Sequence, residues 1–242
     1  MNYFDISGKN VLVTGSARGI GKHISDSLKE LGANVIDTDV AFDVYTSQKW
    51  GGDLTDPENM STLLEMVKSE HGHLDALINN AGITLPSEKK SYPVHNWKKT
   101  ISVNLDLPFV LTSRAIKEDL LSRNSSVINI ASLNASMAFP NNPAYVASKT
   151  GLVGLTRSFA LDYGHMGIRF NTVSPGYIRT DMTGESWTNL EKRKARQART
   201  ALGRWGTPDD LIGLIVLLCS DSSSYITGQD FLIDGGWSIK GL

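Results

Sequence analysis

Short apolar segments alternate with longer helical segments along almost the whole chain of 242 residues. The segments with strand character are 10–15, 34–37, 75–82, 125–132, 168–176 and 229–234. The helical segments are 19–32, 57–72, 95–121, 143–164 and 208–220. Apolar strands that alternate with long helices are typical of a parallel sheet whose two faces are both covered. The sequence therefore predicts a doubly wound α/β fold with a mainly parallel sheet of about seven strands.

One connection in this pattern is unusually short. Only 13 residues, 40–52, separate Asp39 at the end of the second strand from Asp53. A crossover with its own helix needs at least about 10–12 residues and its loops. We therefore expect a turn there in place of a helix. Because no linker, repeat or low-complexity tract interrupts the chain, we expect residues 1–242 to form a single domain.

The composition excludes several classes of function. A net charge of −1 provides no general attraction to nucleic acid or to an anionic membrane. The only cysteine, Cys219, excludes an internal disulfide and fits a reducing compartment. It lies in the longest apolar run, 211–219, whose nine residues are too few to span a bilayer. The start, MNYFDISGKN, lacks the apolar core of a signal peptide. We expect a cytoplasmic protein with no nucleic-acid partner, no membrane association and no metal site.

A glycine-rich turn, TGSARGIG (14–21), joins the first predicted strand to the first helix. Its spacing differs from the G-x-G-x-x-G fingerprint, but the physical requirement is the same. Glycines let the backbone approach a pyrophosphate, whose charge is stabilised by free N–H groups and the helix N-terminus. At the first strand–helix junction of a parallel sheet, this turn indicates a dinucleotide site. The expected contacts are Gly15, Arg18, Gly19, Ile20 and Gly21.

The second predicted strand ends in DTD, and Asp39 lies 18 residues beyond Gly21. A carboxylate near this position can accept hydrogen bonds from both ribose hydroxyls of NAD, and it would repel the 2′-phosphate of NADP. Arg18 argues in the other direction, because an arginine beside the turn could pair with that phosphate. A solvated turn aspartate is the alternative interpretation of Asp39. We predict NAD as the cofactor, with NADP less favoured.

A tyrosine precedes a lysine by four residues in two places, YVASK (145–149) and YTSQK (45–49). On a helix, this spacing puts both side chains on one face, where the ammonium can act on the phenol. Such a pair could form an acid–base catalyst. The spacing alone does not decide which copy is functional, because an exposed lysine beside a half-buried tyrosine is the commoner arrangement.

Further segments complete a resemblance to the short-chain dehydrogenase/reductase family, and it covers nearly the whole chain. The matching segments are TGSARGIG (14–21), NNAG (79–82), SVNL (102–105), IAS (130–132), YVASK (145–149), PGYIRTDM (175–182) and DGG (234–236). Each is a weak signal alone, but their order and spacing together are specific. The resemblance implies a single Rossmann-type domain and an NAD(P)-dependent enzyme that interconverts a secondary alcohol and a ketone.

The resemblance also separates the two tyrosines. Ser132, the family's catalytic serine, lies 13 residues before Tyr145, whereas the same offset from Tyr45 leads to Gly32, which has no hydroxyl. Tyr145 also lies near the start of its predicted helix, where the helix dipole and Lys149 both favour a phenolate. The resemblance thus implies a catalytic set of Asn104, Ser132, Tyr145 and Lys149, with Tyr145 as general acid/base.

The chemistry explains why these residue types occur together. Hydride transfer to or from an alcohol carbon requires a proton to be moved from or to its oxygen. A free phenol has a pKa of about 10, so a pKa near 7 requires positive charge nearby, which Lys149 and, in the oxidised complex, the nicotinamide ring would provide. The Ser132 hydroxyl would hold the substrate oxygen. By resemblance, Asn104 would help to hold a relay water near Lys149; the alternative is a polar residue that bends its helix.

Other cofactor contacts follow from the resemblance alone. Asp53 and Leu54 would lie against the adenine, although Asp53 could equally be a turn or N-cap residue ahead of Pro57. Asn80 and Gly82 would flank the adenosine ribose. The segment that closes on the nicotinamide would supply Pro175, Gly176, Ile178 and Thr180, with Tyr145 and Lys149 also in contact.

Residues 183–206 would form the substrate lid in this family. The segment carries two acids, Glu185 and Glu191, and six cations, Lys192, Arg193, Lys194, Arg196, Arg199 and Arg204. These cations could contact an anionic substrate such as a sugar phosphate or a carboxylate, or they could form a solvated helix face. Trp187 and Trp205 could cover a sugar face or pack the lid down.

The resemblance implies a homodimer or homotetramer formed through the helices at 95–121 and 143–164. Ala147, Gly151, Gly154 and Ser158 place small residues along one face of the second helix. The predicted function is NAD(H)-dependent oxidation and reduction of a polar hydroxy compound, such as a sugar. Two alternatives remain: an NADPH-dependent 3-oxoacyl-carrier-protein reductase and a non-catalytic NAD-binding regulator.

Overall fold

The computed structural model describes residues 3–86 and 91–241. Eight strands form one sheet in the order β3-β4-β2-β1-β5-β6-β7-β8, in which every pair is parallel except β3 with β4. The strands are β1 (Asn10–Thr14), β2 (Asn34–Asp39), β3 (Tyr45–Thr46), β4 (Lys49–Gly51), β5 (Ala76–Asn79), β6 (Ser126–Ile130), β7 (Arg169–Pro175) and β8 (Asp230–Ile233). The predicted doubly wound fold is confirmed.

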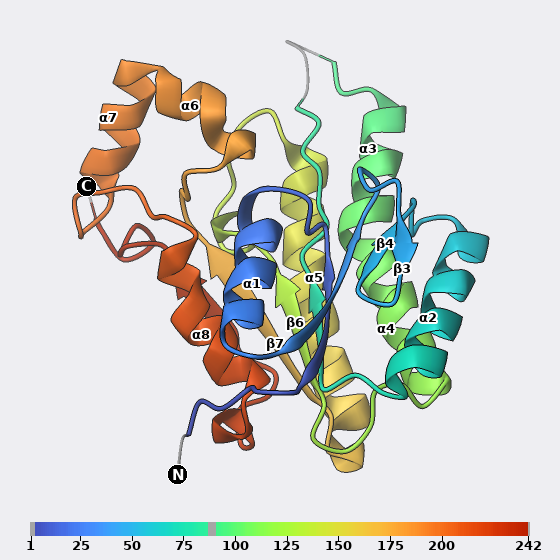
Figure 1. Cartoon of the computed structure of the whole chain (residues 1–242). Helices are drawn as coiled ribbons and strands as arrows, with labels where there is room; N and C mark the ends of the chain where they lie inside the picture. Colours follow the sequence, from blue (N-terminus) through green and yellow to red (C-terminus); the bar gives the residue numbers. More distant parts are fainter. Residues whose placement is uncertain (1–2, 87–90, 242) are drawn as a thin grey trace.

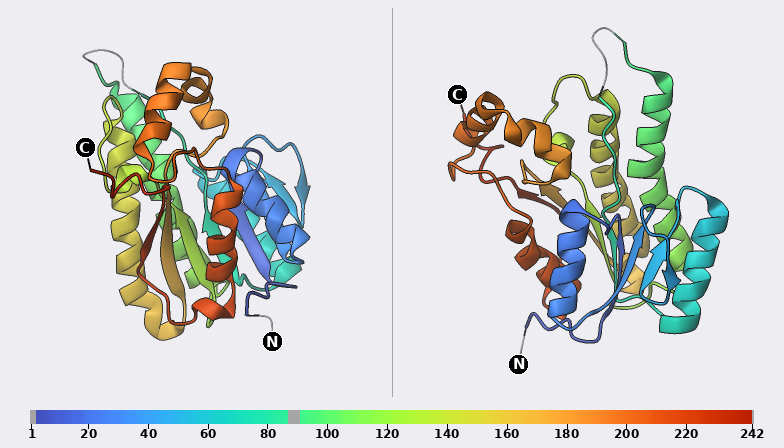
Figure 2. Two further views of the ribbon diagram at one scale, coloured as in Figure 1. Left: turned by 90° about the vertical axis from the view of Figure 1, so that its left-hand side faces the viewer. Right: turned by 45° about the horizontal axis from the view of Figure 1, so that its top comes forward.

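Helices cover both faces of the sheet (Figures 1 and 2). The helices are α1 (Gly19–Glu30), α2 (Pro57–His71), α3 (Val94–Ile101), α4 (Leu107–Lys117), α5 (Pro143–Tyr163), α6 (Gly184–Thr188), α7 (Leu190–Arg199) and α8 (Asp209–Cys219). Successive side chains of a strand point to opposite faces. Accordingly, Leu12 packs into a core with α2, α4 and α5, whereas Val11 and Val13 pack with α1 and α8.

The short connection after β2 contains a hairpin instead of a helix. Tyr45 and Thr46 pair antiparallel with Trp50 and Lys49, and this two-residue strand is the additional eighth strand. The ring of Tyr45 contacts the ring of Trp50 edge-on, with 5.6 Å between their centroids. Tyr45 is 69% exposed, so the first Tyr-x-x-x-Lys copy lies on the surface of a hairpin and does not share a helix.

The long helix expected over 95–121 is divided into three parts. A π-helix, Ser102–Asp106, lies between α3 and α4. Pro108 lies in the first turn of α4, where a proline is compatible with a helix. π-Helical turns inside α-helices occur frequently at functional sites. The π-helix here contains Asn104, a residue of the predicted catalytic set.

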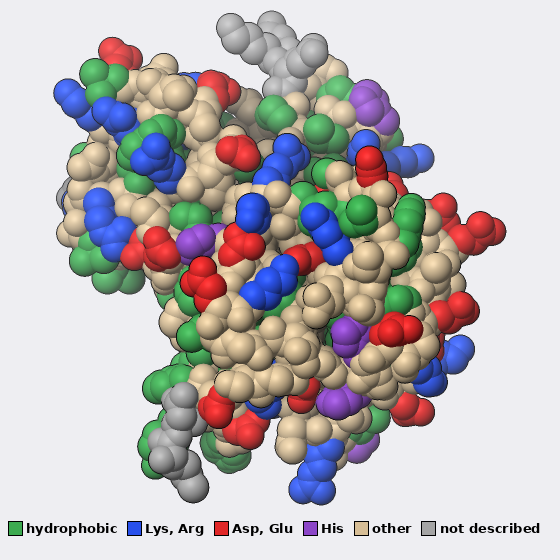
Figure 3. Space-filling view, in the orientation of Figure 1, with side chains coloured by type: hydrophobic (Ala, Val, Ile, Leu, Met, Phe, Trp, Pro, Cys, Tyr) green, Lys and Arg blue, Asp and Glu red, His purple; other side chains and the backbone are tan. Residues whose placement is uncertain are grey.

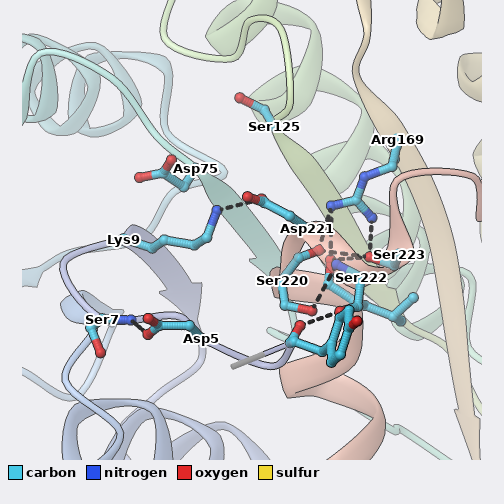
Figure 4. Close-up of polar contacts among 12 residues, drawn as sticks. Asp5, Ser7, Lys9, Asp75, Ser125, Arg169, Ser220, Asp221, Ser222 and Ser223 are labelled. Atoms are coloured by element: carbon cyan, nitrogen blue, oxygen red, sulfur yellow. Dashed lines mark hydrogen bonds and ion pairs between the residues drawn. The ribbon is translucent and has the colours of Figure 1, made fainter. Parts of the chain in front are cut away.

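A buried arginine stabilises the edge of the sheet opposite the carboxyl ends of the strands (Figure 4). Arg169 begins β7 and is 7% exposed. Its guanidinium donates to Ser223 Oγ (2.5 Å) and to Leu218 O (3.1 Å), so it neutralises the C-terminal end of α8. Burial lowers the pKa of Arg169.

No helix in the described parts of the chain is long and apolar enough to cross a membrane.

Candidate active site

Three residues of the predicted catalytic set meet beyond the carboxyl end of β6. Ser132 follows this strand, and its hydroxyl accepts a hydrogen bond from Asn134 N (3.2 Å). Tyr145 lies in the first turn of α5, which Pro143 begins. Lys149 lies one turn later and is 4% exposed; its Nζ is 5.7 Å from the centroid of the Tyr145 ring. The structure therefore brings the second Tyr-x-x-x-Lys copy, and not the first, together with Ser132.

The electrostatics of this cluster differ from the sequence-based expectation. Burial raises the pKa of Tyr145, and contact with Ser132 opposes this rise only in part. Burial also lowers the pKa of Lys149 to about 8. The protein groups alone therefore do not lower the pKa of Tyr145, and the predicted lowering also depends on the positive charge of the oxidised nicotinamide ring. The reason is that a buried site penalises the phenolate and the ammonium alike.

A hydrogen bond holds the ammonium of Lys149 in this position. Its Nζ donates to the carbonyl oxygen of Ile130, the last residue of β6, over 2.7 Å. Because this bond is buried, it satisfies polar groups that water does not reach. It also fixes the amine beside the phenol of Tyr145.

Asn104 connects the cluster to the loop that follows β5. It is fully buried; its Oδ1 accepts from Ile83 N (2.8 Å), and its Nδ2 donates to Ile83 O (2.9 Å). The same Nδ2 donates to Ser148 Oγ (3.2 Å), which donates to Tyr145 O (2.8 Å). The side chain thus clamps a loop to α5. The sequence analysis missed Ser148, although it lies inside the YVASK segment.

Gly82 lies between two of these groups. A methyl group at this position would lie 3.5 Å from Asn104 Oδ1 and 3.5 Å from Lys149 Nζ. The NNAG segment therefore borders the catalytic cluster as well as the glycine-rich turn.

The glycine-rich turn has the close backbone approach that a pyrophosphate site requires. A methyl group at Gly21 would lie only 2.2 Å from Gly15 O, which is too close for any side chain, so this position requires glycine. Gly15 and Gly19 have positive φ angles of 68° and 58°, in the region that favours glycine. Asn80 Nδ2 donates to Thr14 O (2.9 Å) and Gly15 O (3.0 Å), so this amide braces the turn.

The turn lies beside the predicted nicotinamide segment. A methyl group at Gly19 would approach Thr180 Cβ to 3.8 Å. Pro175 is buried at the end of β7, Gly176 packs against Asp234, and Ile178 forms a bridge with Gly206. Ile20 is partly buried against the core beneath the turn. These contacts bring both ends of the predicted cofactor site to the carboxyl edge of the sheet, which fits an extended dinucleotide.

Asp39, the predicted ribose contact, ends β2 beside the glycine-rich turn. The half-buried carboxylate accepts hydrogen bonds from Ala17 N (3.1 Å) and Ala41 N (2.9 Å). Each carboxylate oxygen has a second lone pair, so both can still accept a hydroxyl. Arg18, the N-cap residue of α1, is exposed.

Asp53 and Leu54 have different environments. Asp53 is exposed, and its Oδ1 accepts from Thr55 N (2.9 Å) and Thr55 Oγ1 (2.7 Å). The N-cap of α2 is Asp56, so Asp53 is a turn residue. Leu54 is 5% exposed and belongs to the core beside α2.

The expected lid contains α6 and α7, which lie above the carboxyl ends of the strands in Figure 1. A chain of aromatic rings packs beneath it. The ring centroids are 5.4 Å apart for Trp187 and Trp205, 5.3 Å for Trp205 and Tyr177, and 5.0 Å for Tyr177 and Trp237. Tyr177 also contacts Phe139, in the loop between Ser132 and α5, edge-on at 6.1 Å.

Sequence reasoning found the two tryptophans of the lid but missed Tyr177, Trp237 and Phe139. Tyr177 lies within the quoted PGYIRTDM segment, and Trp237 directly follows DGG, so their positions were signals that could have been used. The rings join the lid to the catalytic loop.

Comparison with known proteins agrees with this arrangement. A family model described as Enoyl-(Acyl carrier protein) reductase matches residues 15–238. The 2-dehydro-3-deoxy-D-gluconate 5-dehydrogenase of Bacillus subtilis is 35% identical over 97% of this chain and 96% of its own. A 3-oxoacyl-(acyl-carrier-protein) reductase of Vibrio cholerae is 34% identical over 96% of this chain and 98% of its own. The chain belongs to the short-chain dehydrogenase/reductase family.

Solved structures of this family share the fold over the whole chain. Ligand-free aldohexose dehydrogenase of Thermoplasma acidophilum has a TM-score of 0.91 and 30% identity, and it covers 99% of this chain and 98% of its own. A 4-hydroxyisoleucine dehydrogenase complexed with NADH has a TM-score of 0.89 and 33% identity, and the match covers 97% of this chain and 100% of its own. A gluconate 5-dehydrogenase of Burkholderia cenocepacia, in complex with NADP and tartrate, has a TM-score of 0.91 and 26% identity, and the match covers 99% of each chain.

This short-chain dehydrogenase/reductase is therefore an oxidoreductase with a nicotinamide dinucleotide cofactor. It interconverts an alcohol and a ketone by hydride transfer.

Proposed function

We propose that this enzyme oxidises a secondary hydroxyl group of a sugar or sugar-like compound with NAD, and catalyses the reverse reduction, with Tyr145 as general acid/base. The observation that carries this proposal is the cluster of Tyr145, Lys149 and Ser132 beyond β6, next to the loop clamped by Asn104. The first Tyr-x-x-x-Lys copy has no comparable surroundings, because Tyr45 lies on an exposed hairpin.

Each side chain has a defined task in this reaction. When bound, the nicotinamide accepts or donates the hydride. The Tyr145 oxygen takes the proton from the substrate hydroxyl during oxidation and returns it during reduction. Lys149, held by the Ile130 carbonyl, stabilises the negative charge of the phenolate. The Ser132 hydroxyl donates to the substrate oxygen as its charge develops.

We propose NAD as the preferred cofactor because of Asp39. Its carboxylate lies beside the turn, held by Ala17 N and Ala41 N, and has lone pairs left for ribose hydroxyls. The 2′-phosphate of NADP would meet a like charge there. Arg18 is exposed at the same turn and would reduce this penalty in part.

The sugar-type substrate is supported by relatives of similar length. Their names include a 2-dehydro-3-deoxy-D-gluconate 5-dehydrogenase and an aldohexose dehydrogenase. The test is an absorbance assay at the wavelength of reduced nicotinamide, with aldoses, alditols, aldonates and sugar phosphates, each with NAD and with NADP. We expect NAD reduction with at least one sugar-type substrate. An enzyme that reduces only an acetoacetyl thioester, and does so with NADPH, would contradict the proposal.

That outcome defines the second candidate, a 3-oxoacyl-(acyl-carrier-protein) reductase. A relative of Vibrio cholerae with this name is 34% identical, and a basic lid would suit an acidic carrier protein. The carboxylate of Asp39 argues against it, since that activity is expected to use NADPH. For a non-catalytic regulator, the same assay would give no turnover.

We also propose that the enzyme assembles as a homodimer or homotetramer through α4 and α5. Phe109 and Val110 on α4 are 48% and 38% exposed, Leu161 on α5 is 84% exposed, and Gly154 has open space beside it. Apolar side chains of this size are consistent with a covered helix pair. The single buried cysteine, Cys219, is consistent with a cytoplasmic location.

A further inference from the structure

The basic residues of the lid differ in their partners. Lys192 pairs with Glu185 (2.6 Å), and Arg204 forms two hydrogen bonds with Asp210 (2.6 and 2.7 Å). Both cations are neutralised within the chain and are exposed. Figure 3 shows that lysine and arginine side chains gather over the lid, at the upper left. Such ion pairs explain two of the six lid cations as surface charge.

The arginines of α7 and its surroundings lie on aromatic rings instead. The Arg193 guanidinium is 5.0 Å from the centroid of the Trp187 ring, and that of Arg199 is 5.6 Å from Trp237. The Arg196 guanidinium is 4.6 Å from the centroid of Tyr177. Stacking of this kind orients a guanidinium but leaves its N–H groups available.

Arg196 is exceptional in its hydrogen bonding. Its Nη1 is buried and lacks an acceptor among the residues that the structure describes; of the two lid cations that are partly buried, Arg193 and Arg196, only Arg196 has such an atom. The charge of Arg196 does act on Glu185, but the pKa of that carboxyl is lowered mainly by Lys192. Buried N–H groups of a cation are seldom left without an acceptor, because desolvation without a hydrogen bond is costly.

Arg196 lies close to segments that are expected to border the substrate. Tyr177, on which it stacks, follows Pro175 and Gly176 at the end of β7. Tyr177 also contacts Phe139 edge-on, in the loop that leads from Ser132 to Tyr145. Arg196 is thus carried by a lid helix and rests on the ring that joins the nicotinamide segment to the catalytic loop.

We propose that Arg196 binds the carboxylate of an anionic substrate, so that the enzyme acts on hydroxy or oxo sugar acids in preference to neutral sugars. This inference rests on the proposed function and narrows its substrate class. When the substrate enters, the lid shifts and the Arg196 fork turns from its stacked position to pair with the carboxylate. A planar carboxylate matches a single guanidinium fork. A phosphate ester, with close to two negative charges, would favour a second cation on the same ring as Arg196, whereas Arg193 and Arg199 lie on Trp187 and Trp237.

The test uses three proteins: the wild type, Arg196→Met and Arg199→Met. The two variants are matched, because each removes an arginine of α7 that stacks on an aromatic ring; Arg196 is partly buried and has a nitrogen without an acceptor, whereas Arg199 is exposed. The ligands are D-gluconate and D-galactonate, with the neutral D-glucitol and galactitol as counterparts and glucose 6-phosphate as the phosphorylated probe. Each is added to the complex of the enzyme with NADH, which cannot oxidise an alcohol, and the melting temperature is measured.

We expect an aldonate to raise the melting temperature of the wild type and of Arg199→Met, and to leave that of Arg196→Met unchanged. With NAD, the KM for the aldonate should rise roughly 10- to 100-fold in Arg196→Met, with kcat/KM for an alditol within about two-fold of the wild type. Arg196→Lys should recover only part of the affinity, since it keeps the charge and loses the fork.

Several outcomes overturn the inference: aldonates that do not stabilise the wild type, an equal effect in both methionine variants, or a larger Arg196-dependent shift with glucose 6-phosphate. The proposed function fails separately. It fails if no sugar-type compound reduces NAD, even where the aldonate still binds through Arg196.

Discussion

Replacing Asp39 with serine should change the cofactor preference of this enzyme. In the wild type, the half-buried carboxylate is fixed beside the glycine-rich turn by the N–H groups of Ala17 and Ala41. Serine removes the negative charge and leaves one short hydroxyl. We expect the variant to lose activity with NAD and to gain activity with NADP, because Arg18 is then free to pair with the 2′-phosphate.

Two effects set the magnitude. Hydrogen bonds from the ribose hydroxyls to a charged acceptor contribute about 1.5–3 kcal/mol, which corresponds to roughly 10- to 100-fold in kcat/KM with NAD. Repulsion between a carboxylate and a phosphate about 4 Å apart costs between about 1 kcal/mol in water and about 4 kcal/mol near a protein surface. Together they predict a wild-type preference for NAD of at least ~100-fold. In Asp39→Ser, the ratio should fall to within about ten-fold of unity.

The assay measures kcat/KM with both cofactors at a saturating concentration of one substrate. Asp39→Asn removes the negative charge but keeps an acceptor oxygen of the same shape. Its ratio of kcat/KM with NAD to that with NADP should lie between those of the wild type and Asp39→Ser. Asp43 is an exposed acid four residues further along the chain, and Asp43→Ser should leave the ratio unchanged. A wild type that turns over faster with NADPH, or an Asp39→Ser variant with an unaltered ratio, would refute the reasoning.

Three further predictions concern stability and the turn. Burial lowers the pKa of Lys149 from 10.5 to about 8. Between pH 8 and pH 10.5 the folded chain therefore binds fewer protons than the unfolded chain, and its stability rises with pH. Urea denaturation at pH 7 and pH 9 should show that the free energy of unfolding of the wild type, relative to that of Lys149→Met, rises by about 1 kcal/mol. If this difference between the two proteins does not change with pH, the prediction is wrong. Arg169→Met should lower the free energy of unfolding by about 2–4 kcal/mol, because the end of α8 loses its donors, with kcat unchanged; a loss below about 0.5 kcal/mol would count against the network. Gly21→Ala places a methyl group 2.2 Å from Gly15 O and should raise the Kd for NADH at least ten-fold by fluorescence titration, whereas Gly213→Ala, in open space on α8, should not change it.

The layered fold followed from the sequence because hydrophobic periodicity and glycine-rich turns are local signals. The same reasoning anticipated that the segment 40–52 lacks a crossover helix. It did not find the hairpin there, because β3 has only two residues and depends on pairing with β4. The break of the 95–121 helix at Ser102–Asp106 was also missed, since it depends on bonds between Asn104 and the distant Ile83.

In the active site too, features that depend on local sequence could be predicted, whereas features that depend on tertiary packing could not. The order of motifs indicated Tyr145 over Tyr45, and the structure brings Ser132 and Lys149 to the former. The burial of Tyr145 was not foreseen, and in the chain itself it outweighs the local effect of a helix start and a neighbouring lysine on the pKa of the phenol. The unpartnered nitrogen of Arg196 could not be foreseen either, since it results from packing between α7 and Tyr177.

The most direct test of the account is to measure turnover and NADH affinity together in Tyr145→Phe and Tyr45→Phe. The phenol of Tyr145 moves the proton but does not anchor the dinucleotide, so its loss should lower kcat by about 10²–10⁴-fold while the Kd for NADH stays within about three-fold. Tyr45→Phe should leave both values within a few-fold of the wild type. If Tyr145→Phe keeps more than a tenth of the wild-type kcat, or if both variants lose activity equally, Tyr145 is not the general acid/base of this enzyme.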